Sequence, residues 1–281
     1  MSIYLTILVA TVAACFGLQH LALKAVGGRT AKSESNYFSS LARIQAGTKG
    51  QPEIMLLGSS ITGRLPDRSQ GYAGIANLGC DGGSAVDVLM AMDQGILPAG
   101  PLLVIEANSL TIAVAAPRTE ISLAMEGWWF QLGLRWAALS ATARPSAFAY
   151  SMLLGRRTGM AEPPGHGGTL GNQTLPGPVA PAAGTALAEV DRQFVDRVSE
   201  IIGRLKARGS RFVIVWLPPK RAEGEGPALG VAIAQALARQ TGARWWDLAM
   251  DATVPVKLTD GVHMDSSSAA KTIRSLLEGL R

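Results

Sequence analysis

Short runs of consecutive apolar residues, each followed by small or polar residues, recur along the chain from residue 52 onward. Runs this short and wholly apolar are typical of strands buried on both faces of a parallel sheet. Between them, apolar residues recur at helical spacing, and some of these segments stop at a glycine, as helices often do. We predict strands at residues 54–57, 75–78, 102–105, 212–217 and 245–248, and helices at residues 86–96, 187–208, 229–240 and 266–280.

The alternation of strands and helices predicts an α/β fold in three layers, with a central parallel sheet and right-handed crossovers. In such sheets, ligands bind outside the carboxyl ends of the strands. The predicted strands are followed by polar or small clusters, among them Gly-Ser-Ser at 58–60, Gly79 and Glu-Ala-Asn at 106–108. The alternation alone therefore predicts a functional site where these clusters meet.

Residues 111–186 interrupt this alternation. The first part is rich in aromatic and aliphatic residues, including a tryptophan-rich stretch at 128–136. We interpret that part as helices that cover the sheet or form a lid, with the aromatic side chains mainly in the core. The second part, residues 155–184, is rich in Gly and Pro and lacks periodicity, which predicts a loop.

The N-terminal segment is strongly apolar. Residues 3–18 carry no charge and the apolar character resumes at 21–23, so the run has about the 20 residues that a membrane span requires. No basic region precedes it, as a cleaved signal peptide would have, so we predict an uncleaved transmembrane anchor over residues 1–26. A lipoprotein cleavage box ending at Cys15 and a buried core helix are alternatives. Residues 27–51, with a short helical pattern near residues 37–44, are interpreted as a tether before a catalytic domain at 52–281.

The charges near this segment give a conflicting indication of orientation. Lys24, Arg29 and Lys32 follow the span, and only the α-amino group precedes it. The positive-inside rule would keep the following domain in the cytoplasm. The function expected below requires the outer face, and we expect the domain there.

Composition narrows the classes of partner. Of 281 residues, 48% are hydrophobic and 17% are charged, and the net charge is +5. The Lys and Arg residues are scattered, without a basic run or interleaved aromatics, so nucleic-acid binding is not expected. The two cysteines, Cys15 and Cys80, give neither a disulfide framework nor a zinc pattern, and we expect no metal or organic cofactor.

Ser60 directly follows the first predicted strand, in the sequence Ile-Met-Leu-Leu-Gly-Ser-Ser. A serine on a tight turn after a strand exposes its hydroxyl group and leaves its backbone N–H free to stabilise an oxyanion. The alternative is that Ser59 or Ser60 only caps a helix, which serine commonly does.

Asp260-Gly-Val-His263 lies just before the last predicted helix. A carboxylate beside Nδ1 of a histidine sets its tautomer and leaves Nε2 to accept a proton from a serine. The chain contains only three histidines. The alternative is a solvated surface turn, because Asp-Gly is a common turn pair.

Together these segments resemble the SGNH (GDSL-type) hydrolase superfamily, over most of residues 52–281 and in four separated blocks. The resemblance implies a flavodoxin-like sheet, with Ser60 as nucleophile, His263 as base and Asp260 orienting His263. A second block, Asn-Leu-Gly-Cys-Asp-Gly-Gly at 77–83, makes Gly82 an oxyanion donor.

A third block, Val-Ile-Glu-Ala-Asn, implies that Asn108 joins Ser60 and Gly82 in an oxyanion hole. Two positions depart from the family pattern. Ser59 stands where aspartate is usual before the nucleophile, and Glu106 stands where the third block usually has glycine. We expect Glu106 to form a structural salt bridge; tuning of His263 and binding of a sugar hydroxyl are the alternatives.

The resemblance implies a serine-dependent esterase or acyltransferase. Anchored members of the family often act on O-acetyl groups of envelope or secreted polysaccharides, so the expected substrate is an acylated carbohydrate. The expected location is the bacterial inner membrane, with a periplasmic domain associated with polysaccharide synthesis or acetylation machinery. One alternative is a lipid-directed esterase or thioesterase, which a deep apolar pocket lined by residues 128–154 would favour. The other is a non-catalytic subunit of a polysaccharide synthesis complex.

Overall fold

The computed structural model describes residues 2–25, 35–147, 149, 150, 153, 188–219, 229–251 and 256–280. The strands are β1 (Ile54–Leu57), β2 (Ile75–Asn77), β3 (Leu102–Glu106), β4 (Arg211–Trp216) and β5 (Arg244–Asp247). The α-helices are α1 (Ser2–Ala25), α2 (Asn36–Gly47), α3 (Ser60–Gly63), α4 (Ala85–Asp93), α5 (Leu110–Ala115), α6 (Glu120–Glu126), α7 (Trp128–Arg135), α9 (Glu189–Ala207), α10 (Leu229–Thr241), α11 (Leu248–Asp251) and α12 (Ser266–Leu280). The 3-10 helices are η1 (Arg68–Gln70), η2 (Ala107–Ser109), η3 (Ala137–Leu139) and η4 (Ala141–Ala143).

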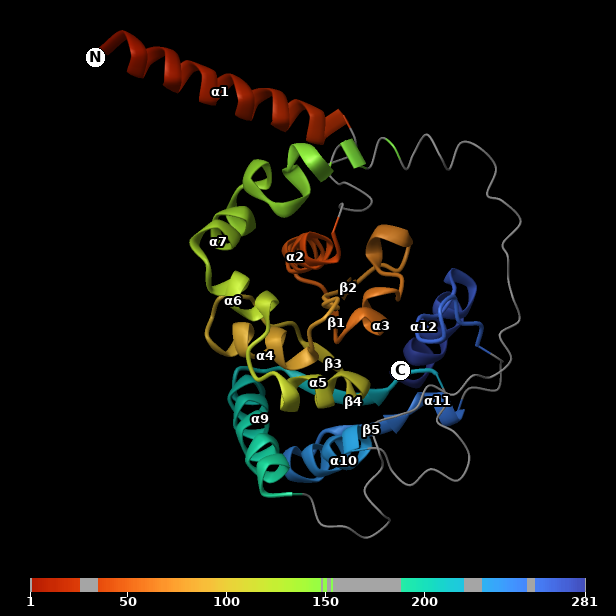
Figure 1. Cartoon of the computed structure of the whole chain (residues 1–281). Helices are drawn as coiled ribbons and strands as arrows, with labels where there is room; N and C mark the ends of the chain where they lie inside the picture. The colour runs from red at the N-terminus through yellow and green to blue at the C-terminus, as the bar shows by residue number, and fades with distance from the viewer. Residues whose placement is uncertain are drawn as a thin grey trace.

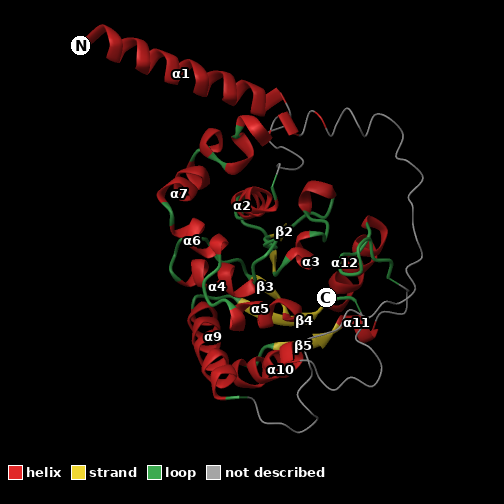
Figure 2. Ribbon diagram, viewed as in Figure 1, coloured by secondary structure: helices red, strands yellow, loops and turns green. Residues whose placement is uncertain are grey.

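The five strands form one parallel sheet in the order β2-β1-β3-β4-β5 (Figure 2). This confirms the predicted α/β class, and each predicted strand is present with its ends displaced by no more than one residue. The register pairs Leu57 with Ile105 and Ile105 with Ile214. The carboxyl ends of β1, β3 and β4 therefore lie at one edge of the sheet.

Apolar side chains cover both faces of the sheet, so the domain has three layers (Figure 1). Alternation along β1 illustrates the division: Met55 and Leu57 belong to one buried cluster, and Leu56 belongs to the other. The first cluster includes residues of α2, α4, α9 and α10, and the second includes residues of α3 and α12. Burial on both faces explains why the strands are wholly apolar in sequence.

The strand order changes direction at β1. The chain passes from β1 to β2 on one side, and β3 lies on the other side of β1. In open parallel sheets of this order, the crevice outside the carboxyl ends at such a point is the usual ligand site. Residues after β1 and β3 are therefore brought to one rim, as the polar clusters in the sequence predict.

Helix α2 lies within the segment that the sequence interprets as a tether, residues 27–51. Leu41 and Ile44 are fully buried and belong to the first cluster. Gln45, also buried, donates to the Phe130 carbonyl at 3.0 Å and accepts from the Ala141 N–H at 2.8 Å. Residues 36–47 are thus part of the folded domain, held by the interrupting segment.

The described part of the interrupting segment forms α5, α6, α7, η3 and η4, and its helices pack against α2 and α4 and against one another. Phe130 is fully buried, but Trp128 and Trp136 are 74% and 58% exposed. The prediction that the aromatic stretch belongs mainly to the core is therefore wrong at these two positions. The predicted loop at 155–184 lies outside the described residues.

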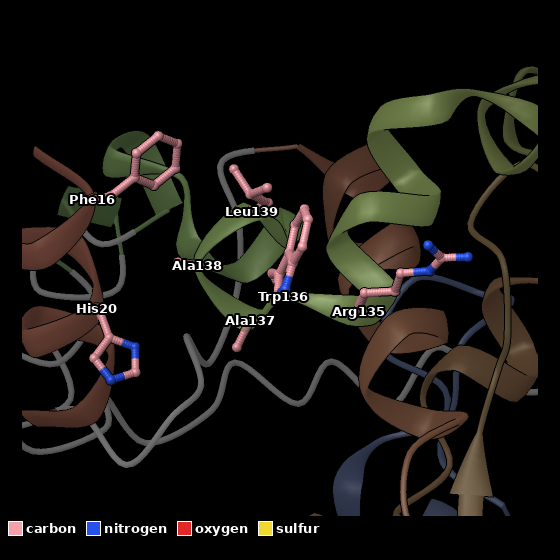
Figure 3. A pocket seen from close by; sticks show the side chains of 7 residues that line it. All are labelled: Phe16, His20, Arg135, Trp136, Ala137, Ala138 and Leu139. Atoms are coloured by element: carbon pink, nitrogen blue, oxygen red, sulfur yellow. The ribbon is translucent and has the colours of Figure 1, made fainter. Parts of the chain in front are cut away.

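Helix α1 is an exposed apolar helix, with 23 residues suited by length and composition to cross a membrane. Near its end, Leu23 is buried and the Gln19 side chain donates to the Ala143 carbonyl. Figure 3 shows Phe16 and His20 on α1 beside residues 135–139, with which they line a hollow of about 450 Å³. A helix of this kind serves as a membrane anchor or as a signal sequence.

Candidate active site

Three predicted site residues meet at the rim of the sheet. Ser60 Oγ lies 2.8 Å from His263 Nε2, although the two residues are 203 positions apart. On the opposite side of the imidazole ring, Nδ1 lies 2.6 Å from Asp260 Oδ2. Both distances are within hydrogen-bonding range, and the order hydroxyl, imidazole, carboxylate is that of a nucleophile, its base and an orienting group.

The turn that carries His263 is fixed from within and from α12. Asp260 Oδ1 accepts from the Val262 N–H at 3.1 Å and from the His263 N–H at 2.8 Å, and Gly261 has φ +82°. Leu258 and Met264 form an antiparallel bridge across the base of the turn. Met264 is buried among the residues of the second cluster, so the turn is anchored to the core.

Asp260 is ionised under all but strongly acidic conditions. Burial tends to raise its pKa, but the side-chain and backbone hydrogen bonds from His263 and the backbone hydrogen bond from Val262 outweigh burial and lower the pKa to about 2. The ordinary pKa is 3.8. A permanently charged carboxylate at Nδ1 holds the tautomer in which Nε2 faces Ser60 as an acceptor.

Ser60 is the first residue of α3, and the cap of that helix is Ser59. Ser59 has extended backbone angles, and its Oγ accepts from the Ile61 N–H at 3.3 Å. This assigns helix capping to Ser59 and leaves the Ser60 hydroxyl group for His263. Among the described residues, the Ser60 N–H has no hydrogen-bond partner.

Gly82 lies on an exposed turn in the loop after β2, with φ +76° and open space where a Cβ would be. In the described part of the chain its N–H also lacks a partner. The loop is tied to the Ser60 turn, because the Cys80 N–H donates to the Gly58 carbonyl at 2.8 Å. Gly82 is therefore on the same rim as Ser60, with a free donor.

Asn77, at the end of β2, holds that loop against α3. Its side-chain nitrogen donates to the carbonyls of Thr62 at 2.7 Å and Leu65 at 2.6 Å, and its Oδ1 accepts from the Gly79 N–H at 2.9 Å. The side chain is buried. The sequence analysis assigned no role to Asn77. The signal available in the sequence was an amide side chain near the end of a predicted strand, two residues before Gly79.

Asn108 follows β3 and is half-buried. Its side chain bonds reciprocally to Leu217, donating to the carbonyl at 3.0 Å and accepting from the N–H at 2.9 Å. The structure does not bond Asn108 to Ser60 or His263. Leu217 takes one amide hydrogen, and the second hydrogen has no partner in the described ranges, so the side chain is fixed with one donor left.

Glu106 forms no salt bridge with any described residue, so that prediction is wrong. Its side chain is 1% exposed and accepts four hydrogen bonds from the Ser60 turn. The donors are the backbone N–H and the hydroxyl group of Ser59 and of Thr62. Burial raises the pKa of Glu106, while these four hydrogen bonds oppose the rise.

The rim around Ser60 is open. Side-chain exposure is 18% for His263 and 53% for Asp260. Two hollows lie elsewhere. One, of about 400 Å³, is lined by Tyr37 and Glu120 among others. The other, of about 450 Å³, lies between α1 and residues 135–139 (Figure 3). The juxtaposed side chains, rather than these hollows, identify the candidate site. Within the described ranges, no group of three or more His, Cys, Asp and Glu side chains is placed to hold a metal ion.

The fold and the site geometry are the basis for assigning this chain. Comparisons with models of protein families, with curated proteins and with solved structures give no match. The fold, an α/β fold with a five-stranded parallel sheet in the order β2-β1-β3-β4-β5, is consistent with SGNH-like folds.

Proposed function

We propose that the protein is an SGNH-type serine esterase or acyltransferase that acts on O-acetyl groups of an envelope or secreted polysaccharide. The observation that carries the proposal is the continuous contact from Ser60 Oγ through the His263 ring to Asp260, with distances of 2.8 and 2.6 Å. A serine hydroxyl group becomes an effective nucleophile when such a base removes its proton.

In the first half of the reaction, Ser60 Oγ attacks the acyl carbonyl carbon while its proton moves to His263 Nε2. The carbonyl oxygen becomes an oxyanion, which the free N–H groups of Ser60 and Gly82 and the remaining amide hydrogen of Asn108 are proposed to stabilise. One such donor typically contributes about 3 kcal/mol to the transition state. The intermediate then collapses, the leaving alcohol takes the proton from His263, and the acyl group stays on Ser60.

In the second half, His263 removes a proton from the hydroxyl group that attacks the acyl-Ser60 ester; the bond to Ser60 Oγ then breaks, and Oγ recovers the proton from His263. Water gives hydrolysis and a sugar hydroxyl group gives transfer, and exclusion of water decides between them. The exposure of the rim, where the Asp260 side chain is 53% exposed, supports a chain-like acceptor in this proposal. The substrate class itself rests on the resemblance of the four sequence blocks to anchored polysaccharide-modifying members of the SGNH superfamily.

The test is ester hydrolysis by the full chain in detergent. p-Nitrophenyl acetate is compared with p-nitrophenyl decanoate, and an acetylated polysaccharide is assayed for released acetate. Ser60→Ala should lower acetate-ester turnover by about 10³-fold or more. Ser69→Ala is the matched control, because Ser69 is an exposed serine that bonds to Asp67 outside the site.

Each result selects among the candidate functions. Acetate-selective turnover that disappears only in Ser60→Ala supports the proposal. A Ser60-dependent preference for decanoate would instead indicate a lipid-directed esterase or thioesterase. Equal rates in Ser60→Ala and the unaltered chain would indicate a non-catalytic subunit of a synthesis complex and contradict the proposal.

The proposed location is the inner membrane, with α1 as a single span and the folded domain in the periplasm. Support comes from the apolar surface of α1, which is exposed. Within the described residues, the domain covers only the last turns of this helix. In that position the domain would meet acylated polysaccharide and its synthesis or acetylation machinery.

A further inference from the structure

The buried carboxylate of Glu106 lies directly behind the turn that carries Ser60. Glu106 is the last residue of β3, and its side chain is 1% exposed. Oε2 accepts from the Ser59 N–H at 2.9 Å, the Thr62 N–H at 3.0 Å and the Thr62 hydroxyl group at 2.5 Å. Oε1 accepts from the Ser59 hydroxyl group at 2.7 Å. Every hydrogen bond of this carboxylate therefore goes to residues 59–62.

These hydrogen bonds determine which backbone N–H groups around the candidate nucleophile are already paired. The N–H groups of Ser59 and Thr62 point to Glu106, and the Ile61 N–H points to the Ser59 oxygen, which Glu106 itself orients. Of the four N–H groups at residues 59–62, only that of Ser60 has no partner in the described chain. The carboxylate thus fixes a turn in which one N–H is left for an oxyanion.

The backbone is shaped to admit this carboxylate. A Cβ on Gly58 would lie 2.2 Å from Glu106 Oε2 and 2.6 Å from Glu106 Cβ, far inside van der Waals contact. Because glycine has no Cβ, the loop after β1 can approach the end of β3 this closely. Because Glu106 is on the middle strand, it ties the turn to the centre of the sheet.

The donor set also defines the chemical state that the turn requires. The two backbone amides can only donate, and both are directed to one oxygen of Glu106. An ionised carboxylate accepts all four hydrogen bonds, whereas a protonated one must give up an acceptor site or turn a hydroxyl group around. A buried charge is costly unless it is hydrogen-bonded in this way, so these four hydrogen bonds are what allow Glu106 to be ionised at this position.

We propose that Glu106 is the positioning residue of the nucleophile turn: it holds Ser60 Oγ in reach of His263 Nε2 and keeps the Ser60 N–H directed at the developing oxyanion. The inference rests on the proposed serine-dependent function. Among the described residues, Glu106 forms no hydrogen bond with His263, and it acts through residues 59–62.

The test replaces the carboxylate with its neutral isostere, Glu106→Gln, in the full chain in detergent. Two rates are measured: covalent labelling of Ser60 by a fluorophosphonate probe, and turnover of p-nitrophenyl acetate. We expect both to fall by about 10- to 100-fold, because a displacement of about 1 Å at a reacting group has an effect of this size. We expect KM to change less than twofold, since ground-state binding does not use the turn.

Asp87→Asn is the matched control. Asp87 is also a buried carboxylate in a hydrogen-bonded network, with Ser84 and Thr119, and its pKa is raised mainly by burial. It should lose thermal stability without the loss of kcat. If kcat falls equally in both variants, the effect is general destabilisation and the inference is overturned.

Two milder variants keep the proposal testable if Glu106→Gln does not fold. Ser59→Ala and Thr62→Val each remove one hydroxyl donor to Glu106 and keep both backbone donors. Each should slow labelling of Ser60, and in combination with a folded Glu106→Gln the losses should be less than additive, because the residues act as one unit. Unaltered labelling in both single variants would overturn the inference.

The outcomes also separate this inference from the proposed function. Wild-type labelling and turnover that depend on Ser60 but persist fully in Glu106→Gln overturn the positioning role and leave the esterase proposal intact. Absence of Ser60-dependent labelling and turnover in the unaltered chain overturns both. A loss confined to kcat and to labelling in Glu106→Gln, with KM unchanged and with kcat unaltered in the Asp87→Asn control, supports the positioning role.

Discussion

At the residue scale, the two contacts of the His263 ring depend on different parts of the molecule. Its contact with Asp260 is local, because both side chains and both backbone N–H bonds belong to one turn. Its contact with Ser60 spans 203 positions and exists only when the sheet, α3 and α12 are assembled. The Asp260 contact therefore depends on the geometry of one turn, whereas the Ser60 contact depends on the packing of the whole domain.

Replacing Asp260 with Asn tests the local contact. Asp260→Asn removes the charge that holds the His263 tautomer, so kcat should fall by about 10²- to 10⁴-fold, with little change in KM. Asp265→Asn is the matched control: Asp265 accepts from the Ser268 N–H at the start of α12, at 2.7 Å, and does not contact His263. Steady-state kinetics with p-nitrophenyl acetate measure both. Equal losses in the two variants would contradict the orienting role.

Asp260→Asn should also lower the free energy of unfolding by an amount that depends on pH. The pKa of Asp260 is depressed from 3.8 to about 2 in the folded state, so its pairing stabilises the fold above pH 4 and this contribution is lost as pH falls toward 2. The difference in unfolding free energy between the unaltered chain and Asp260→Asn should therefore shrink over that range. Chemical denaturation at a series of pH values measures it.

The residues of the candidate site differ in how well sequence predicts them. Ser60, Asp260 and His263 could be proposed because each stands in a short block whose chemistry is visible in adjacent positions. Glu106 was predicted to form a salt bridge, and it forms none with the described residues. Its four donors lie 44 and 47 positions away, and strand periodicity shows only that residue 106 ends an apolar run. A buried carboxylate among backbone donors is a tertiary property, which no local pattern records.

At the scale of elements, the rim is built by the close approach of the loops after β1 and β2 and the end of β3. The loop after β1 receives Glu106 from β3 on one side, and on the other side it receives the loop after β2. A Cβ on Gly79 would lie 2.3 Å from the Gly63 backbone nitrogen and 2.8 Å from the Ser59 carbonyl oxygen. Because these are backbone atoms, the clash cannot be relieved by rotating a side chain.

Gly79→Ala is expected to separate the loop after β2 from α3. Overpacking of this kind typically costs about 1–3 kcal/mol, which lowers the thermal midpoint by several degrees. Gly203→Ala is the control, because Gly203 is in α9 and has open space at its Cβ position, so alanine should stabilise the helix by up to about 1 kcal/mol. Circular dichroism melts measure both. A stable, fully active Gly79→Ala variant would show that the approach of the two loops is not required.

Sequence patterns predicted the elements to different degrees. The strands were predictable because burial on both faces makes them uniformly apolar, which distinguishes them from the helices around them. Helix α2 was assigned to a tether because its buried apolar side chains, Leu41 and Ile44, are few and lie among polar and small residues. Its burial depends on Phe130 and Ala141, from a segment about 90 positions later, so its packing could not be read locally.

At the scale of the whole molecule, α1 is the one described helix whose apolar surface the domain leaves almost entirely uncovered. At about 1.5 Å per residue, its 23-residue apolar stretch extends about 34 Å, enough to cross a hydrocarbon core of about 30 Å. Composition predicted this element directly. The predicted outer-face orientation came from the expected function alone, because Lys24, Arg29 and Lys32 favour the opposite topology.

Membrane fractionation tests the role of α1, with the full chain compared with a chain that begins at Ser35, the N-cap residue of α2. The full chain should sediment with membranes and resist extraction with high salt, because burying about 20 apolar residues in lipid greatly outweighs any surface charge. The shortened chain should be released while keeping Ser60-dependent turnover, since α1 contributes no residue to the rim. Intact mass separates the alternatives: a complete N-terminus identifies an anchor, a lipid-modified Cys15 identifies a lipoprotein, and an unmodified shorter chain in the soluble fraction identifies a cleaved signal sequence. Only the first result is compatible with the single-span arrangement proposed for this protein.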